Sequence, residues 1–428
     1  MKELTRLIRD DMKPALGVTE PGAIALAVAT AREHLGEQAE RVELSLNSGI
    51  YKNAFTCGIP GTSHVGNAYA AALGAIAADP EKGLLCLDGI REEQVQQAEQ
   101  MVRDGKITVH MSGITSRIYI EALVTGKTHK ASALIRDAHT NIVKITEDDK
   151  VIFQKAVTEE DEAHADVPTI HRYSLAQILD YVQTVPVEEI SFIREAFTMN
   201  MDLLAEGLDH PRTRFAKVLR TMNGGNVISE DVIRTANLLC SGAIEARVIG
   251  LNKPAMSITG SGSHGIIATM PLYAWYKVRH CSREQLLRAT ALSFLVCMYI
   301  KEYSGKLSAF CGCAIAAGTG AACGLVYLMG GKENVMAKAI NNMSSSITGM
   351  ICDGGNQGCV MKGMTAVELA YSSAELALQD AYIANDHGIN GATPEQTMKN
   401  MGLIASPGMV GTEKTIVDIL QTKNGQEA

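Results

Sequence analysis

The residues best suited to chemistry in this sequence lie in one glycine-rich segment around residue 355. Its sequence is ICDGGNQGC, so six residues, three of them glycine, separate Cys352 from Cys359. Glycine permits the positive φ angles and the close backbone approach that such a loop needs. Thiolates are good ligands for iron–sulfur clusters and for zinc, and backbone N–H groups can bond to cluster sulfides. The segment therefore predicts a metal site, with unliganded buried thiols as the alternative.

A third thiolate for such a site is available in the segment FCGC, which contains Cys311 and Cys313. The sequence leaves open which of the two would bind. Three thiolates without an obvious fourth would leave one iron with a free coordination position. A Lewis-acid cluster that binds its substrate needs that arrangement.

A second candidate segment is TGSGSHG at residues 259–265, which precedes the apolar run IIATMP. A Gly/Ser loop that leads into a helix presents unpaired backbone N–H groups, and these bind anions such as a carboxylate. Ser261, Gly262 and Ser263 are therefore candidate substrate-binding residues. His264 can carry a proton near neutral pH. The alternative for this segment is a simple tight turn.

The third candidate segment covers residues 47–66, NSGIYKNAFTCGIPGTSHVG. Here Lys52 and Asn53 could hold a carboxylate, and His64 could act as an acid or base. A solvated lysine and a histidine near a helix start are the alternatives. A lysine that forms a Schiff base with pyridoxal phosphate is a further one, supported only by Lys52.

Composition and charge restrict the class of protein. The chain has 428 residues, of which 46% are apolar and 20% charged, and these values exclude a disordered protein. The formal net charge is −8, so no basic excess exists to neutralise nucleic acid or an anionic membrane. Residues 307–331 carry no charge, but they are rich in Gly, Ala, Ser and Cys, and we expect a buried helix there rather than a membrane span.

The ten cysteines and the charged, amphipathic first twelve residues indicate a cytoplasmic protein whose cysteines are thiols. Hydrophobic periodicity predicts an α+β fold in two domains. Residues 1–170 would form an α+β lobe with an antiparallel sheet of about four strands between residues 107 and 154. An acidic linker at residues 158–166 would follow. Residues 171–428 would form a nearly all-helical lobe.

Taken together, six ordered motifs resemble the iron–sulfur L-cysteine desulfidases of the UPF0597 type. The helical part of that family is related to the α-chain domain of iron–sulfur L-serine dehydratases. The motifs are PALGVTEP at 14–21, YKN and PGT within 51–62, HTNI at 139–142, GSGSHGIIATMP at 260–271, LSAFCGC at 307–313 and GMICDGGNQGCVMK at 349–362. The resemblance spans nearly the whole chain.

The resemblance implies a [4Fe–4S] cluster held by Cys311, Cys352 and Cys359, with Cys313 as the alternative to Cys311. It also implies a lyase that needs no pyridoxal phosphate and converts L-cysteine to pyruvate, ammonia and hydrogen sulfide. Related reactions remain alternatives, namely serine dehydration or elimination from another β-substituted or hydroxy acid. We expect a homodimer, the commonest symmetric assembly, acting on a small amino acid.

One position departs from the family pattern. The family's first motif usually reads Gly-Cys-Thr-Glu-Pro, and Val18 stands where that cysteine would be. Valine neither takes a proton nor binds iron, so we assign catalytic roles to His64, His264 or the retained Glu20, with Cys57 as a further candidate base. A non-catalytic sensor of a cluster or amino acid is the alternative that this substitution raises.

Overall fold

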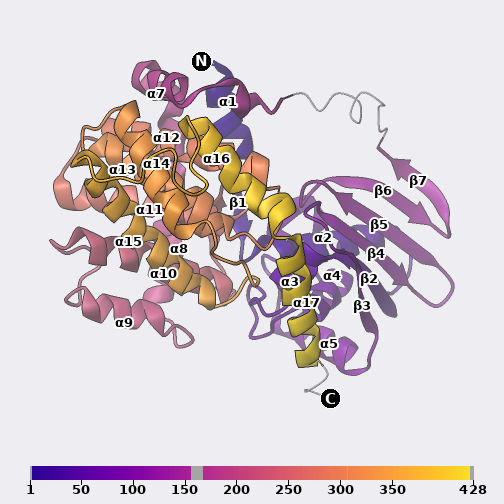
Figure 1. The fold of residues 1–428 in the computed structure, drawn as a ribbon. Helices are drawn as coiled ribbons and strands as arrows, with labels where there is room; N and C mark the ends of the chain where they lie inside the picture. Colours follow the sequence, from indigo (N-terminus) through magenta and orange to yellow (C-terminus); the bar gives the residue numbers. More distant parts are fainter. Residues whose placement is uncertain (1, 156–166, 306, 425–428) are drawn as a thin grey trace.

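The computed structural model describes residues 2–155, 167–305 and 307–424 (Figure 1). The acidic linker predicted at residues 158–166 lies outside the described residues. A mixed sheet with helices on one face forms one part of the molecule, and a packed group of helices forms the other (Figure 1). The predicted α+β class is confirmed.

The sheet has six strands in the order β3-β2-β4-β5-β6-β7. Their bounds are β2 Arg41–Asn47, β3 Ile107–Gly113, β4 Tyr119–Thr125, β5 Lys130–Arg136, β6 Ile142–Glu147 and β7 Lys150–Gln154. Alternate residues of β4 and β5 are buried, because α2 (Thr19–Glu33) packs across this face. The sheet thus presents one covered face to the helix that carries Glu20.

The expected antiparallel pairing is present from β2 to β7, but residues 107–154 form five strands where about four were expected, and one pair of the sheet is parallel. β2 inserts between β3 and β4, and it pairs in parallel with β3. A parallel neighbour requires a crossover connection, which the chain makes through α3 (Ser48–Ala54), α4 (Asn67–Ile76) and α5 (Glu92–Arg103). The alternating pattern of each strand is visible in the sequence, but the pairing order is not.

The second part of the molecule is helical, as expected. Its helices are α7 Leu175–Thr184, α8 Arg194–Leu208, α9 Phe215–Met222, α10 Val232–Val248, α11 Gly262–Arg279, α12 Arg283–Ser304, α13 Gly318–Leu328, α14 Glu333–Ile347, α15 Gly358–Leu378 and α16 Pro394–Leu403. Small residues allow close approach: a Cβ on Gly320 would lie 2.3 Å from the carbonyl oxygen of Ser293 on α12. The core is therefore built from tightly packed Ala- and Gly-rich helices.

Segments from each end of the chain pack against the other part of the molecule. β1 (Lys13–Leu16), which follows the first helix α1 (Lys2–Asp11), pairs antiparallel with β8 (Pro254–Ser257) of the helical part. The C-terminal helix α17 (Val410–Asn424) packs against α3 and lies between the helical group and the sheet (Figure 1). One buried hydrophobic cluster includes residues from both parts. Their junction is where the candidate site lies.

None of the helices in the described residues combines the length and the apolar character needed to cross a membrane. The uncharged stretch at 307–331 forms a loop, a π-helical turn at Cys313–Ala317 and the buried helix α13. All ten cysteines are free thiols. Single ones such as Cys240 and Cys297 are fully buried, as predicted.

Candidate active site

Two segments about forty residues apart in sequence bring the candidate metal ligands together. The backbone of Phe310 forms a β-bridge with Ile351. On either side, the N–H of Cys311 donates to the carbonyl of Met350 (3.0 Å), and the N–H of Cys352 donates to that of Ala309 (2.6 Å). This pairing sets the FCGC turn beside the glycine-rich loop.

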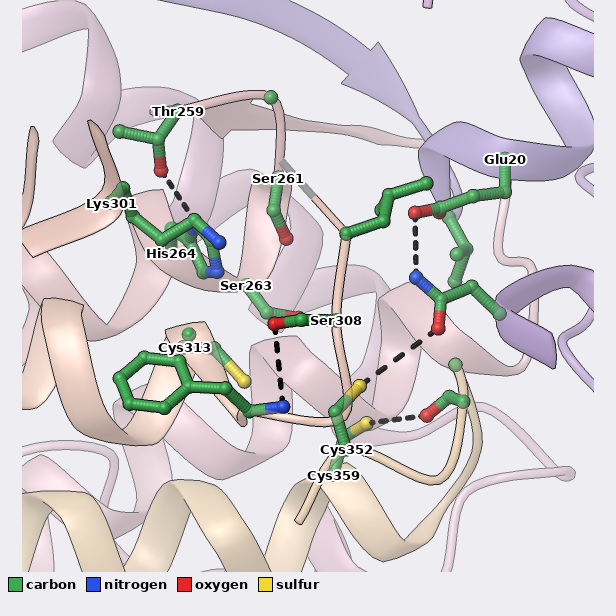
Figure 2. Close-up of a pocket in the computed structure, with 18 of the residues that line it drawn as sticks. Glu20, Thr259, Ser261, Ser263, His264, Lys301, Ser308, Cys313, Cys352 and Cys359 are labelled. Carbon is green, nitrogen blue, oxygen red and sulfur yellow. Dashed lines mark hydrogen bonds between the residues drawn. The ribbon is translucent and has the colours of Figure 1, made fainter. Parts of the chain in front are cut away.

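The two segments form one wall of a cavity of about 630 Å³ (Figure 2). Cys313, Cys352 and Cys359 line the cavity, whereas Cys311 does not. Cys311 is only 1% exposed, and its Sγ lies behind the wall, 3.4 Å from Sγ of Cys313. The geometry therefore favours Cys313 over Cys311 as the third cavity thiol.

The glycines between the cysteines let the loop lie against α3. Gly354 has a φ of +116°, and a Cβ there would be 2.6 Å from the carbonyl oxygen of Lys52. The N–H of Gly355 donates to the carbonyl of Asn53 (3.1 Å). A side chain at either position would push the loop, and the two thiols at its ends, away from α3.

The thiols differ in how readily they ionise. A hydrogen bond from Cys311 lowers the pKa of the Cys313 thiol to about 7 against the effect of burial, with help from the positive charges of Lys362 and Arg247. Burial and the neighbouring thiols raise the pKa of Cys359 to about 12. Within the pair, Cys313 thus ionises more readily than Cys311. Metal ligation requires the thiolate form.

The donor set fits a cluster better than a single ion. In the part of the chain that the structure describes, no three His, Cys, Asp or Glu side chains are grouped so that they could hold one metal ion. A [4Fe–4S] cluster does not need its ligands to converge on one atom, because each thiolate binds its own iron. Three thiols spread along one wall of a shared cavity satisfy this requirement.

Across the cavity from the thiols lies Glu20, at the start of α2 (Figure 2). Its carboxylate accepts hydrogen bonds from Asn53 Nδ2 (2.9 Å) and from the hydroxyl of Thr19 (3.0 Å). Nε2 of His139 lies 3.7 Å from Oε1, at ion-pair distance. Burial would raise the pKa of Glu20, but His139, Asn53 and Arg247 together lower it to about 2. The carboxylate is therefore ionised at neutral pH.

A buried arginine supplies the opposite charge. Arg247, near the end of α10, is 4% exposed and lines the cavity. Its Nη1 donates to the hydroxyl of Ser263 (2.9 Å), while its Nε has no hydrogen-bond partner among the described residues. A buried guanidinium with unused donors is suited to bind a carboxylate.

His264 lies on the wall opposite Glu20, near Lys301 (Figure 2). The hydroxyl of Thr259 lies 2.5 Å from Nδ1 of His264 and 2.8 Å from the carbonyl oxygen of Ile258, so Thr259 fixes the orientation of the ring. Nε2 faces Gly312 between the two cysteines of FCGC. Burial, Lys301 and Arg247 hold the pKa of His264 well below its usual value, so the ring is neutral.

The structure brings most of the predicted site residues together. The cavity wall includes Glu20, Asn53, Ser261, Ser263, His264, Cys352 and Cys359. Gly262 does not line it; its backbone packs against the side chain of Arg247, where a Cβ would lie 2.6 Å from Nε. Val18 does line the cavity, and Cys57 is fully buried beneath it with a pKa raised by burial.

Two predicted residues lie outside the cavity. The side chain of Lys52 is fully buried, and its ammonium donates to protein acceptors, so it cannot reach a substrate carboxylate or form a Schiff base. His64 pairs with Glu99 (Nε2 to Oε1, 2.6 Å) and stacks on Tyr69 (ring centroids 4.2 Å apart). Neither the carboxylate role of Lys52 nor the catalytic role of His64 fits these positions.

Replacing His64 with glutamine should therefore change kcat/KM by less than about threefold, the effect of a substitution worth no more than about 0.5 kcal/mol. Steady-state assays of this variant beside a His264→Gln variant test the assignment. A large loss at His64 with no loss at His264 would reverse it.

Sequence reasoning did not assign roles to Arg247, His139 and Lys301, all of which line the cavity. Arg247 and Lys301 each lie on the buried side of a long apolar helix. A charged residue at a buried helical position is rare, so this pattern could have indicated a functional role for both. His139 belongs to the motif HTNI in the β5–β6 connection, and nothing in its local pattern indicates that it faces Glu20.

Comparison with known proteins identifies the family of this chain. Residues 81–418 match the family described as serine dehydratase alpha chain. The chain belongs to this family, whose name indicates a lyase-type enzyme. A UPF0597 protein of Clostridium botulinum (strain Langeland) is 42% identical over 423 residues, covering 97% of this chain and 98% of the relative. UPF0597 proteins of Desulfatibacillum aliphaticivorans (36% identical, 96% of each chain) and Clostridioides difficile (35%, 98% of this chain and 99% of the relative) also match.

Proposed function

We propose that this chain is an iron–sulfur lyase that removes the β-substituent of a small amino acid, converting L-cysteine to pyruvate, ammonia and hydrogen sulfide. One observation carries the proposal: three thiols, an ionised carboxylate and a buried guanidinium line the same cavity. Cys313, Cys352 and Cys359 would hold a [4Fe–4S] cluster. When bound, the cluster would supply an iron with an open position that acts as a Lewis acid toward the leaving group.

The charges of the cavity complement an α-amino acid. Glu20, ionised and held by Asn53, would accept hydrogen bonds from the α-ammonium group. Arg247 and Ser263 would hold the α-carboxylate, together with N–H groups at the start of α11. This orientation directs the β-carbon of the substrate toward the wall that carries the thiols.

The elimination needs a base for the α-proton. His264 is neutral, and with its own proton on Nδ1 the Nε2 atom at the cavity would take the α-proton while Thr259 fixes the ring. The C–S bond breaks as the C–H bond does, and the leaving HS− takes up the proton that His264 removed and departs as hydrogen sulfide. The aminoacrylate product then tautomerises to an imine. Water then hydrolyses the imine to pyruvate and ammonia. The positive charge of Lys301 beside His264 favours the anionic character that develops on the substrate.

The alternative substrates differ in how well their charged groups match those of the cavity. Serine would present the same ammonium and carboxylate groups, so it fits equally well. A hydroxy acid has no ammonium group to donate hydrogen bonds to the ionised Glu20. The inert side chain of Val18 on the cavity wall supports the second candidate, a non-catalytic sensor of an amino acid.

Anaerobic reconstitution with iron and sulfide tests the proposal. We expect about four irons and four sulfides per chain, a broad visible absorption that oxygen bleaches, and release of pyruvate from L-cysteine or L-serine. Lactate and glycerate should give no product, and removal of iron by a chelator should abolish turnover. Fully loaded protein that binds cysteine but releases neither sulfide nor ammonia would support the sensor instead.

A further inference from the structure

The side-chain nitrogen of Lys52 bonds to three segments that lie far apart in the sequence. Its Nζ donates to the carbonyl of Ser308 (3.1 Å), to the carbonyl of Cys352 (2.9 Å) and to Oε2 of Glu413 (2.7 Å). An ammonium group has three N–H donors, so each bond uses one of them. The side chain is fully buried, and these bonds are short and charge-assisted.

Two of these acceptors belong to the segments that carry the cavity thiols. Ser308 precedes the FCGC turn, and Cys352 opens the glycine-rich loop. Both residues line the cavity with side-chain or backbone atoms, while their carbonyls point away from it toward α3. The ammonium of Lys52 therefore holds both thiol segments from behind.

The third acceptor arrives from the far end of the chain. Glu413 lies in the first turn of α17, is 4% exposed, and has an Oε1 without a hydrogen-bond partner in the described residues. α17 is attached through Val417, which belongs to the main core, and through a small separate hydrophobic cluster of Ala309, Ile416 and Leu420. Ala309 also belongs to the thiol segment, so α17 contacts that segment twice.

We propose that Lys52 and Glu413 are positioning residues: by docking Glu413 on Lys52, the C-terminal helix fixes the spacing of the two thiol segments. The carboxylate compensates the buried ammonium, which would otherwise carry an unpaired charge. The ammonium in turn ties both carbonyls to α3. This role concerns the protein before any cluster or substrate binds, so it goes beyond the proposed reaction.

Residue-resolved alkylation of the unloaded, reduced protein tests the proposal. We compare Glu413→Ala with a double variant, Lys52→Met together with Glu413→Leu. An apolar pair of similar volume often preserves stability where an ion pair is replaced. Cys352 should be alkylated about tenfold faster or more in both, the factor expected when a hydrogen bond to a charged group is lost. Iron bound after reconstitution should fall in parallel.

Two controls make the result specific. Lys414→Ala removes an exposed ion pair with Asp418 on the same helix and should leave both readouts unchanged. Cys281, a half-buried thiol outside the site, serves as the internal reference for alkylation in every variant.

A double variant with wild-type labelling of Cys352 and full iron binding would overturn the positioning role, and a lowered melting temperature in that variant would leave the pair as a stability element only. If Glu413→Ala does not fold, the double variant alone decides. A wild-type chain that binds no cluster would contradict the proposed function, whereas the alkylation rates still decide the role of Lys52 and Glu413.

Discussion

Replacing Cys313, Cys352 or Cys359 with serine is expected to abolish the visible absorption band of the cluster and to lower activity by more than about a hundredfold. Replacing a residue that only contacts a metal ligand already lowers metal affinity or activity by about 10–100-fold, so the loss of a ligand should have a larger effect. A serine hydroxyl is not a soft thiolate donor, and each of the three side chains lines the cavity. Iron and sulfide counts on anaerobically purified variants give the measurement.

The same series decides between the two cysteines of FCGC. Cys311→Ser should retain the cluster, because Cys311 lies behind the wall and only donates to Cys313. Its loss should make the Cys313 thiol harder to ionise and slow cluster assembly. Cys281→Ser is the matched control. Full iron content in Cys313→Ser with none in Cys311→Ser would restore the ligand set that the sequence motifs imply.

The second large effect is expected from the two charged residues that we propose recognise the substrate, Arg247 and Glu20. Arg247→Met should raise KM for L-cysteine by at least about thirtyfold, because truncating a buried charge pair costs 2–5 kcal/mol. Glu20→Gln should raise it by about 10–150-fold, the range for a hydrogen bond to a charged group. Because the pKa of Glu20 is about 2, the wild-type KM should show no change from this group between pH 5 and pH 8.

Substrate analogues separate recognition from general damage to the cavity. L-cysteinamide lacks the carboxylate, so wild type and Arg247→Met should bind it equally. 3-Mercaptopropionate lacks the amine, so wild type and Glu20→Gln should bind it equally. If each variant weakens both analogues alike, the charges do not contact the substrate as assigned.

Much of the site could be predicted because many of its residues belong to short motifs that are recognisable in the sequence. The glycines between Cys352 and Cys359 and the Gly/Ser segment before His264 are needed for backbone reasons that any such loop shares. Both segments line the cavity as expected. The helical character of the second part followed from periodicity alone.

The remaining features depend on contacts between distant residues. Cys311 and Cys313 are two residues apart, and only the turn between them shows which thiol faces the cavity. Lys52 looks like a free cation until Glu413 is placed 361 positions later. The insertion of β2 between β3 and β4 likewise depends on pairing between strands that are distant in the sequence, and no local sequence pattern predicts it.

The pairing of β1 with β8 has a consequence for synthesis of the protein. A ribosome must release residue 257 before the strand at residues 13–16 finds its partner, and it must reach α17 before Lys52 finds its carboxylate. Nascent chains fold from the N-terminus as sequence becomes available. If the chain carries a cluster as proposed, its iron would be delivered after residue 413 has been synthesised, and a chain truncated before that residue would lack the carboxylate that docks on Lys52 behind the thiol segments.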